Sequence, residues 1–265
     1  FSPVAVAAMG AGAQGMGFAP RRLMTSHKAS LERGAPMIEA GLWYRPNYFP
    51  IPGEANWRQS CDREVGYVRN VVGVCDVSTL GKIDIQGPDV AAFLDFVYIN
   101  VFSTLKPGRV RYGVMLREDG AVMDDGTTAC LGPRHYVMTT STGAAGDVMR
   151  HLEFVHQCLC PQMDVQIMSV TENWAQFAVA GPKSRLLLNG LLDERISNQS
   201  WPFMSCGSVS MQGVTGRLFR ISFSGEHAYE IAVPARYGDS VFRTLVARAE
   251  TMGGGLYGLE ALDIL

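Results

Sequence analysis

An internal repetition constrains the fold of this chain more than any other feature of the sequence. Two Gly-Pro turns, Gly87-Pro88 and Gly181-Pro182, each follow a strand-like apolar run and precede a helical pattern. A later strand that contains a tyrosine follows each turn at nearly the same distance, at Tyr136 and at Tyr229. Two stretches with the same internal spacing indicate a duplicated structural unit.

Each copy has the pattern of strand, helix, hairpin, strand and helix, over about residues 71–160 and about residues 170–250. This order predicts an α+β fold made of two ferredoxin-like halves that pack together, with a ligand at their junction. Residues 1–35 begin with a Gly- and Ala-rich run and are expected to be a linker-like segment. The folded domain is then expected to cover residues 36–265.

The run RYGVMLREDGAVMDDGTTACL is typical of a β-hairpin, because two alternating strand patterns flank a tight-turn pair. A two-residue turn at Asp119-Gly120 would place Glu118 opposite Ala121. In that register Tyr112 lies diagonally from Asp125, on the same face of the hairpin.

The hairpin also contains two neighbouring acids, Asp124 and Asp125, in a position where strands disfavour acidic side chains. Successive strand residues point to opposite faces, so at most one of the two faces the core side. That residue is the first candidate for chemistry, and the alternative interpretation is an acid that caps the turn or the hairpin end.

Glu230 is the corresponding acid of the second copy, within the otherwise apolar strand of FSGEHAYEI. A buried carboxylate needs a partner. A heterocycle with an N–H and an NH₂ on adjacent atoms would satisfy both oxygens, whereas a salt bridge to Arg217 or Arg220 would make Glu230 purely structural.

Composition excludes several classes of function. The net charge of −2 and the absence of a basic stripe argue against binding to nucleic acid or to an anionic membrane. The six cysteines form no CxxC motif and the five histidines form no HxxxH motif, so we expect free thiols in a reducing, cytoplasmic compartment and no metal site. No apolar run reaches the roughly 20 residues that span a bilayer.

Four sequence blocks together resemble the folate-binding aminomethyltransferase family, whose best-known member is the T-protein of the glycine cleavage system. The blocks are CDVSTLGKIDIQGPDVAAFL, EDGAVMDDGTT, FAVAGPKSRLLL and RISFSGEHAYEIAVP. The DDG, TTSTG and GLEAL segments are most similar to the C-terminal folate domain of the α subunit of heterotetrameric sarcosine oxidase. The resemblance implies the folate-binding fold, without the family's C-terminal β-barrel.

The resemblance also implies a role for individual residues. The family's catalytic aspartate matches Asp125, and its folate-site tyrosine matches Tyr112. The pteridine-binding glutamate matches Glu230, and an aromatic residue of the site matches Phe223, which can stack but has no hydroxyl. The family's folate-contacting arginine is replaced here by Leu262.

These matches imply a tetrahydrofolate-binding domain of a sarcosine-oxidase-like enzyme. The one-carbon unit released by oxidative N-demethylation would be captured as 5,10-methylenetetrahydrofolate. Flavin, and NAD if it is used, would bind other domains or other subunits of a hetero-oligomer. Two alternatives stay open, namely a stand-alone aminomethyltransferase that works with a lipoyl carrier and a non-catalytic folate-binding module.

Overall fold

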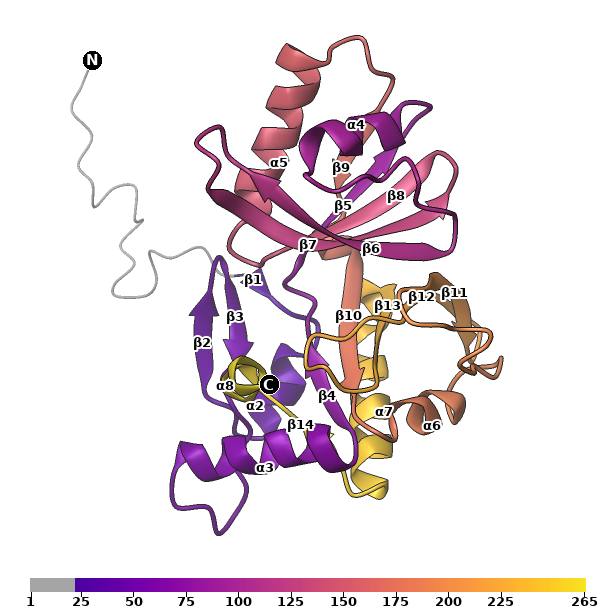
Figure 1. The fold of residues 1–265 in the computed structure, drawn as a ribbon. Helices are drawn as coiled ribbons and strands as arrows, with labels where there is room; N and C mark the ends of the chain where they lie inside the picture. Colours follow the sequence, from indigo (N-terminus) through magenta and orange to yellow (C-terminus); the bar gives the residue numbers. More distant parts are fainter. Residues whose placement is uncertain (1–21) are drawn as a thin grey trace, which may run out of the picture.

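The computed structural model describes residues 22–265 and contains the predicted duplication (Figure 1). Both halves have the order strand, helix, hairpin, strand, helix. The first half consists of β5 (Gly81–Gln86), α4 (Val90–Val97), β6 (Arg109–Leu116), β7 (Val122–Gly132), β8 (His135–Thr140) and α5 (Ala145–Phe154). The second half consists of β10 (Trp174–Ala180), α6 (Ser184–Asn189), β11 (Cys206–Met211), β12 (Val214–Phe219), β13 (Ala228–Pro234) and α7 (Gly238–Thr251).

The strand order of both sheets confirms the ferredoxin-like pairing. The second sheet also contains a strand from an earlier part of the chain. The first sheet has the order β6-β7-β8-β5-β9, where β9 is Gln166–Ser169. The second has the order β11-β12-β13-β10-β4-β14, where β4 is Gly73–Asp76 and β14 is Gly255–Leu256. Strand β4 precedes the first half in sequence, yet it pairs with β10 as β9 pairs with β5. The second sheet is therefore completed by a strand from before the first half.

The two Gly-Pro turns depend on their glycines. Gly87 has a φ of 141° and Gly181 a φ of 127°, values that side-chain-bearing residues rarely adopt. A Cβ at Gly87 would lie 2.1 Å from the carbonyl oxygen of Asp164, and one at Gly181 would lie 2.7 Å from that of Val68. Both positions therefore require glycine for the close approach of another chain segment.

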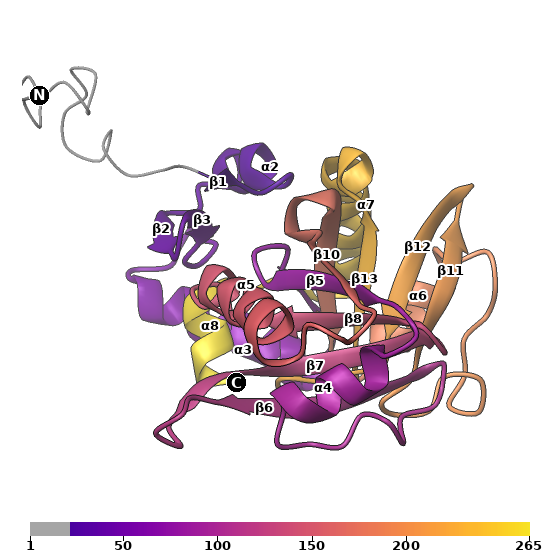
Figure 2. The ribbon, with the colours of Figure 1, turned by 90° about the horizontal axis from the view of Figure 1, so that it is seen from above.

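Each half has its own apolar core, and a smaller cluster joins the two sheets. Viewed from above, α4 and α5 lie over the first sheet (Figure 2). Phe93, Leu94 and Leu152 are fully buried there, and Leu245 of α7 is fully buried in the core of the second half. The joining cluster contains Val110, Ala129, Cys206, Phe219, Ile221 and Ala232. The junction of the halves is thus packed, and a site beside it has rigid walls.

The N-terminal part is more regular than its prolines and aromatics suggested. It contains β1 (Arg22–Leu23), α2 (His27–Glu32), β2 (Met37–Ala40), β3 (Trp43–Pro46) and α3 (Trp57–Asn70). The expected linker falls partly outside the described residues. Its remainder, 22–35, includes β1 and α2, and Ala29 is buried in the core of the second half.

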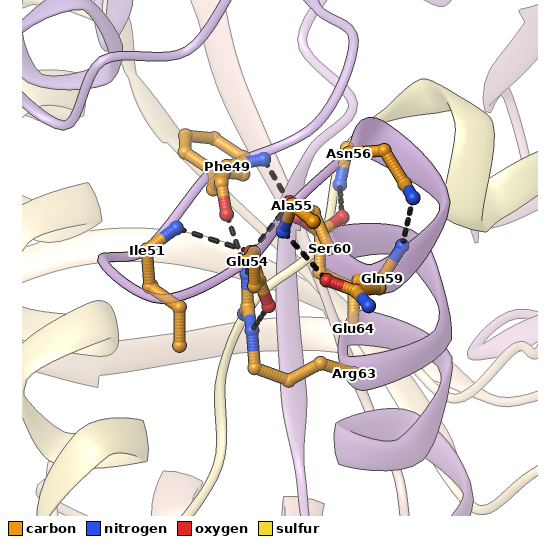
Figure 3. Close-up of polar contacts among 10 residues, drawn as sticks. Phe49, Ile51, Glu54, Ala55, Asn56, Gln59, Ser60, Arg63 and Glu64 are labelled. Atoms are coloured by element: carbon orange, nitrogen blue, oxygen red, sulfur yellow. Dashed lines mark hydrogen bonds and ion pairs between the residues drawn. The ribbon is translucent and has the colours of Figure 1, made fainter.

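Helix α3 fixes the C-terminal helix α8 (Leu259–Ile264) through a buried carboxylate (Figure 3). Asn56 caps α3 by accepting a hydrogen bond from the Gln59 N–H. Glu64 accepts hydrogen bonds from the backbone N–H of Phe49 (2.6 Å) and from that of Gly258 (2.7 Å). Burial raises the pKa of Glu64 to about 7 despite these bonds. The residue before α8 is therefore tied to the N-terminal part of the chain.

The hairpin departs from its predicted turn. The Arg117 N–H donates to the Ala121 carbonyl (2.8 Å), so the loop has three residues and Glu118 does not pair with Ala121. A bulge between Met115 and Leu116 compensates for the extra residue, and the predicted diagonal of Tyr112 and Asp125 is kept.

The remaining elements are short helical turns at Val155–Leu159, Thr171–Asn173 and Ala235–Tyr237. No helix within residues 22–265 is long and apolar enough to cross a membrane. The six cysteines are unpaired; five are buried, and Cys158 is exposed.

Candidate functional site

All four residues selected from the sequence line one cavity of about 420 Å³ between the two halves. Tyr112 and Asp125 come from the hairpin of the first half, and Phe223 and Glu230 come from the second. An inner chamber of about 120 Å³ adjoins this cavity and shares Glu230 and Phe223 with it. The duplication thus brings two acidic residues, one from each half, to a single site.

Asp125 and Tyr112 form a hydrogen-bonded pair at the wall of the first half. The Tyr112 hydroxyl donates to Oδ2 of Asp125 over 2.5 Å. This bond to a carboxylate raises the pKa of Tyr112, so the phenol remains a donor at neutral pH. Both side chains are solvent-accessible, and the carboxylate can reach a ligand in the cavity.

Asp124, rather than Asp125, is the acid that faces the buried side, so the expectation that the candidate faces the core is wrong. Asp124 is 7% exposed and accepts the backbone N–H of Ser141 over 3.1 Å. Burial raises its pKa, although the hydrogen bonds from Ser141 oppose this shift. Ser141 itself lines the cavity. Asp124 therefore holds the cavity wall in place, while Asp125 points into the cavity.

Glu230 has neither of the arginine partners that would make it purely structural. Arg217 packs over Trp174 and approaches Asp84, and Arg220 donates to the Ala228 carbonyl. Instead, Nε2 of Gln176 donates to Oε2 of Glu230. Oε1 has no hydrogen-bond partner among the described residues. The carboxylate is therefore available to the donor edge of a ligand.

Burial raises the pKa of Glu230, whereas the Gln176 hydrogen bond and the charge of Lys82 lower it. Lys82 is 2% exposed, and its Nζ donates to the carbonyls of Ser78 (2.9 Å) and Leu80 (3.0 Å). Burial lowers the pKa of Lys82 to about 8, opposed by Asp76 and Glu230. The ammonium is thus a buried positive charge from the first half that faces the carboxylate of the second.

Sequence reasoning missed several residues of the site. Lys82 and Gln176 are polar positions in strand patterns, where an outward orientation is the usual interpretation. Hydroxyl residues such as Thr139 and Ser141 are typical of a strand end and a helix cap, yet both line the cavity, and Thr139 bonds to Thr127 (3.0 Å). The clue in the sequence was the run of hydroxyl residues directly after a buried strand.

The loop before β13 forms the rim. Phe223 is 74% exposed, so its ring can cover a bound ligand. Glu226 on the same loop forms an ion pair with Arg69 (2.9 Å). Leu262 of α8 lines the inner chamber.

A separate cavity of about 380 Å³ lies beside β1 and β10. Its two charged lining residues, Arg22 and Glu172, form an ion pair with each other (3.3 Å). The junction cavity is the stronger candidate because its carboxylates are not neutralised by arginines or lysines in salt bridges.

The chain belongs to the GCVT N-terminal domain family, whose sequence profile matches residues 26–265. Over its whole length it is 48% identical to sarcosine oxidase subunit alpha of Rhizobium meliloti and covers 27% of that protein. It is 40% identical, also over its whole length, to the subunit alpha of Corynebacterium sp. strain U-96, of which it covers 28%. The chain thus spans about a quarter of these relatives.

Aminomethyltransferases are more distant. The enzyme of Thermotoga maritima is 26% identical over 88% of this chain and 60% of its own length. The crystal structure of glycine cleavage system aminomethyltransferase T from Bartonella henselae matches with a TM-score of 0.76 at 20% identity, over 91% of this chain and 61% of that one. This structural likeness shows that the fold is that of the T-protein.

Proposed function

We propose that this chain is the tetrahydrofolate-binding domain of a sarcosine-oxidase-like enzyme and captures a one-carbon unit as 5,10-methylenetetrahydrofolate. The observation that carries the proposal is the convergence of the Asp125–Tyr112 pair and Glu230 on one cavity between the halves. The similarity of this whole chain to about a quarter of sarcosine oxidase subunit alpha supports it.

The cavity suits a reduced folate. Glu230 offers a carboxylate oxygen without a partner, and the N–H and NH₂ of a pterin ring present two adjacent donors. Phe223 and Tyr112 supply rings on which a flat heterocycle can stack. Tetrahydrofolate would supply two amine nitrogens that accept the carbon of an iminium ion formed at a flavin elsewhere.

The residues of this chain would then handle charge and protons. Asp125 stabilises the cationic iminium substrate and accepts a proton from the attacking amine. Tyr112 orients Asp125 through its hydroxyl, and Glu230 fixes the ring so that the amine nitrogens face Asp125. That proton would pass from Asp125 to the nitrogen of the substrate amine, whose bond to the one-carbon unit breaks with the electron pair staying on that nitrogen. The second folate amine would form its bond to the same carbon and release its own proton to the departing amine. Flavin, any NAD site and the other subunits would belong to the remainder of the assembly.

Calorimetry with 5-formyltetrahydrofolate on the full-length protein tests binding. Glu230→Gln is expected to weaken binding about 100-fold, because loss of a charged acceptor costs about 2–3 kcal/mol. Glu226→Gln, on the loop directly before β13 and paired with Arg69, is the matched control and should bind normally. Absence of binding by the unmodified protein would refute the proposal.

The two alternatives give different results. A non-catalytic folate module would keep its function in Asp125→Asn, whereas an enzyme would lose formation of 5,10-methylenetetrahydrofolate by about 10²-fold or more while folate stays bound. A stand-alone aminomethyltransferase would be active with an aminomethylated lipoyl carrier. The aminomethyltransferase similarity favours this second function, but Leu262 in place of the arginine counts against it.

A further inference from the structure

The inner chamber contains a buried cation that the proposed function does not yet use. Arg45 of β3 is 5% exposed and lines this chamber together with Glu230, Tyr257 and Leu262. Its Nη2 donates to the Asp76 carbonyl oxygen (3.3 Å) and lies 3.8 Å from the Cys75 sulfur. Its Nε is buried without any hydrogen-bond partner.

No carboxylate among the described residues neutralises Arg45. The carboxylate of Asp76 is occupied by the Ser26 hydroxyl and the Ser78 N–H. The Cys75 thiol stays neutral because burial raises its pKa to about 12. A buried guanidinium without a counter-charge is costly, so its retention at a chamber wall requires an acceptor from elsewhere.

The chamber therefore presents two complementary groups that do not pair with each other. Glu230 accepts hydrogen bonds, and Arg45 donates them. A ligand that fits both has adjacent N–H donors on one part of its edge and a carbonyl oxygen next to them. The edge of a 4-oxopterin has this order: the 2-amino group, the N3–H and then the C4 carbonyl oxygen.

We propose that Arg45 is a specificity-determining residue that donates to the C4 carbonyl oxygen of the pterin ring held by Glu230. This inference rests on the proposed function. Arg45 selects 4-oxopterins against 4-aminopteridines, since a 4-amino group would direct its hydrogens at a buried guanidinium. Leu262, which also lines the chamber, provides no donor of its own.

The test uses folic acid and aminopterin, with 5-formyltetrahydrofolate as the reference ligand. The first two differ by an oxo or an amino group at C4 and, as a consequence, by the presence or absence of a hydrogen on N3. The full-length protein, with the subunits that co-purify with it, is expected to prefer folic acid by about 100-fold, because sites built around a hydrogen bond reject analogues that lack it. Arg45→Met should reduce this preference about tenfold, and the part that remains comes from the N3–H that Glu230 accepts. Arg33→Met, an arginine of the same N-terminal part paired with Glu250, should retain it.

Two further variants keep the inference testable if Arg45→Met does not fold. Arg45→Lys keeps the positive charge but loses the planar set of N–H donors of the guanidinium. The affinity for folic acid should therefore fall, whereas the affinity for aminopterin should not. In Arg45→Met/Leu262→Arg, a guanidinium from α8 enters the same chamber and should restore the preference.

The outcomes separate the two hypotheses. If the unmodified protein binds 5-formyltetrahydrofolate but does not discriminate at C4, or if Arg45→Met and Arg45→Lys discriminate like the unmodified protein, the role of Arg45 is refuted and the proposed function stands. If the unmodified protein does not bind 5-formyltetrahydrofolate, both are refuted.

Discussion

Asp124 and Asp125 are adjacent in sequence and have opposite surroundings, because neighbouring side chains of a strand point to opposite faces. Asp124 is buried against the backbone of Ser141, and Asp125 is accessible beside Tyr112. The strand period therefore assigns one acid to positioning the wall and the other to the cavity. The residue after the two acids, Gly126, has no room for a side chain, since a Cβ there would lie 2.0 Å from the Thr139 carbonyl oxygen.

Tyr112→Phe tests whether the hydroxyl orients Asp125. We expect formation of 5,10-methylenetetrahydrofolate to slow by about tenfold, with binding of 5-formyltetrahydrofolate nearly unchanged, because the ring stays and only the orienting bond is lost. Steady-state kinetics and calorimetry on the same preparation measure the two effects. Tyr44→Phe removes a comparable bond to Glu39 outside the cavity and should alter neither. A large loss of binding in Tyr112→Phe would contradict an orienting role.

At the residue level, the sequence predicted the site residues that depart from the apolar pattern of their strands. It missed those whose side chains conform to the pattern around them. Asp125 and Glu230 are acids within strands, so they stood out. Lys82 lies in a strand pattern that tolerates outward polar residues, and Arg45 lies in a stretch where prolines and aromatic residues obscure the alternation. Only the tertiary structure shows that both are buried. Neither local propensity nor spacing encodes which face of a strand another part of the chain will cover.

At the level of elements, prediction succeeded where patterns were strong. The apolar strand patterns HYVMTT and WAQFAVA coincide with β8 and β10, and α3 begins where Asn56 supplies a cap. The hairpin of β2 and β3 was missed because its prolines and aromatics obscure the alternation. β4 was predicted as a strand, but its pairing with β10 depends on a contact between distant segments, which no local pattern specifies.

Glu64 makes the attachment of α8 to α3 dependent on pH. Its pKa is about 7 in the folded protein and its ordinary value is 4.5, so the folded state holds a proton between these values that the unfolded state has lost. The contribution of Glu64 to the free energy of unfolding is therefore largest below pH 4.5. It declines by roughly 2–3 kcal/mol as the pH rises to about 7.

Glu64→Gln should remove that part of the decline. Urea unfolding at several pH values between 4.5 and 7.5 measures the slope, and the exposed Glu250→Gln should leave it in place. An unchanged slope in Glu64→Gln would show that Glu64 is ionised in the folded protein throughout this range.

For the whole molecule, the duplication gives each half an incomplete site. The first half supplies Asp125 and Lys82, the second supplies Glu230 and Gln176, and the N-terminal part adds Arg45. The repeated spacing in the sequence predicted a junction and a ligand there. It did not predict the contribution of β3, because β3 belongs to neither repeat.

Lys82→Met tests whether the halves are electrostatically coupled. In the unmodified protein, the charge of Lys82 lowers the pKa of Glu230 and so opposes the effect of burial. Without this ammonium, the pKa of Glu230 rises further, and the negative charge of Asp76 loses its counter-charge. Binding of 5-formyltetrahydrofolate at pH 7 should weaken about tenfold, as one pKa unit corresponds to 1.36 kcal/mol. Because a rising pH ionises Glu230, affinity of the variant should recover toward pH 9.

Above pH 8 the affinity of the unmodified protein for 5-formyltetrahydrofolate should fall, because Lys82 loses its proton there and no longer stabilises the ionised form of Glu230. The two affinity profiles, measured by calorimetry from pH 6 to pH 9, are therefore expected to converge. Lys183→Met, an exposed lysine bonded to the Met252 carbonyl, is the matched control and should follow the unmodified protein. Parallel profiles would mean that Lys82 supports the packing of the halves without acting on the carboxylate that binds the ligand.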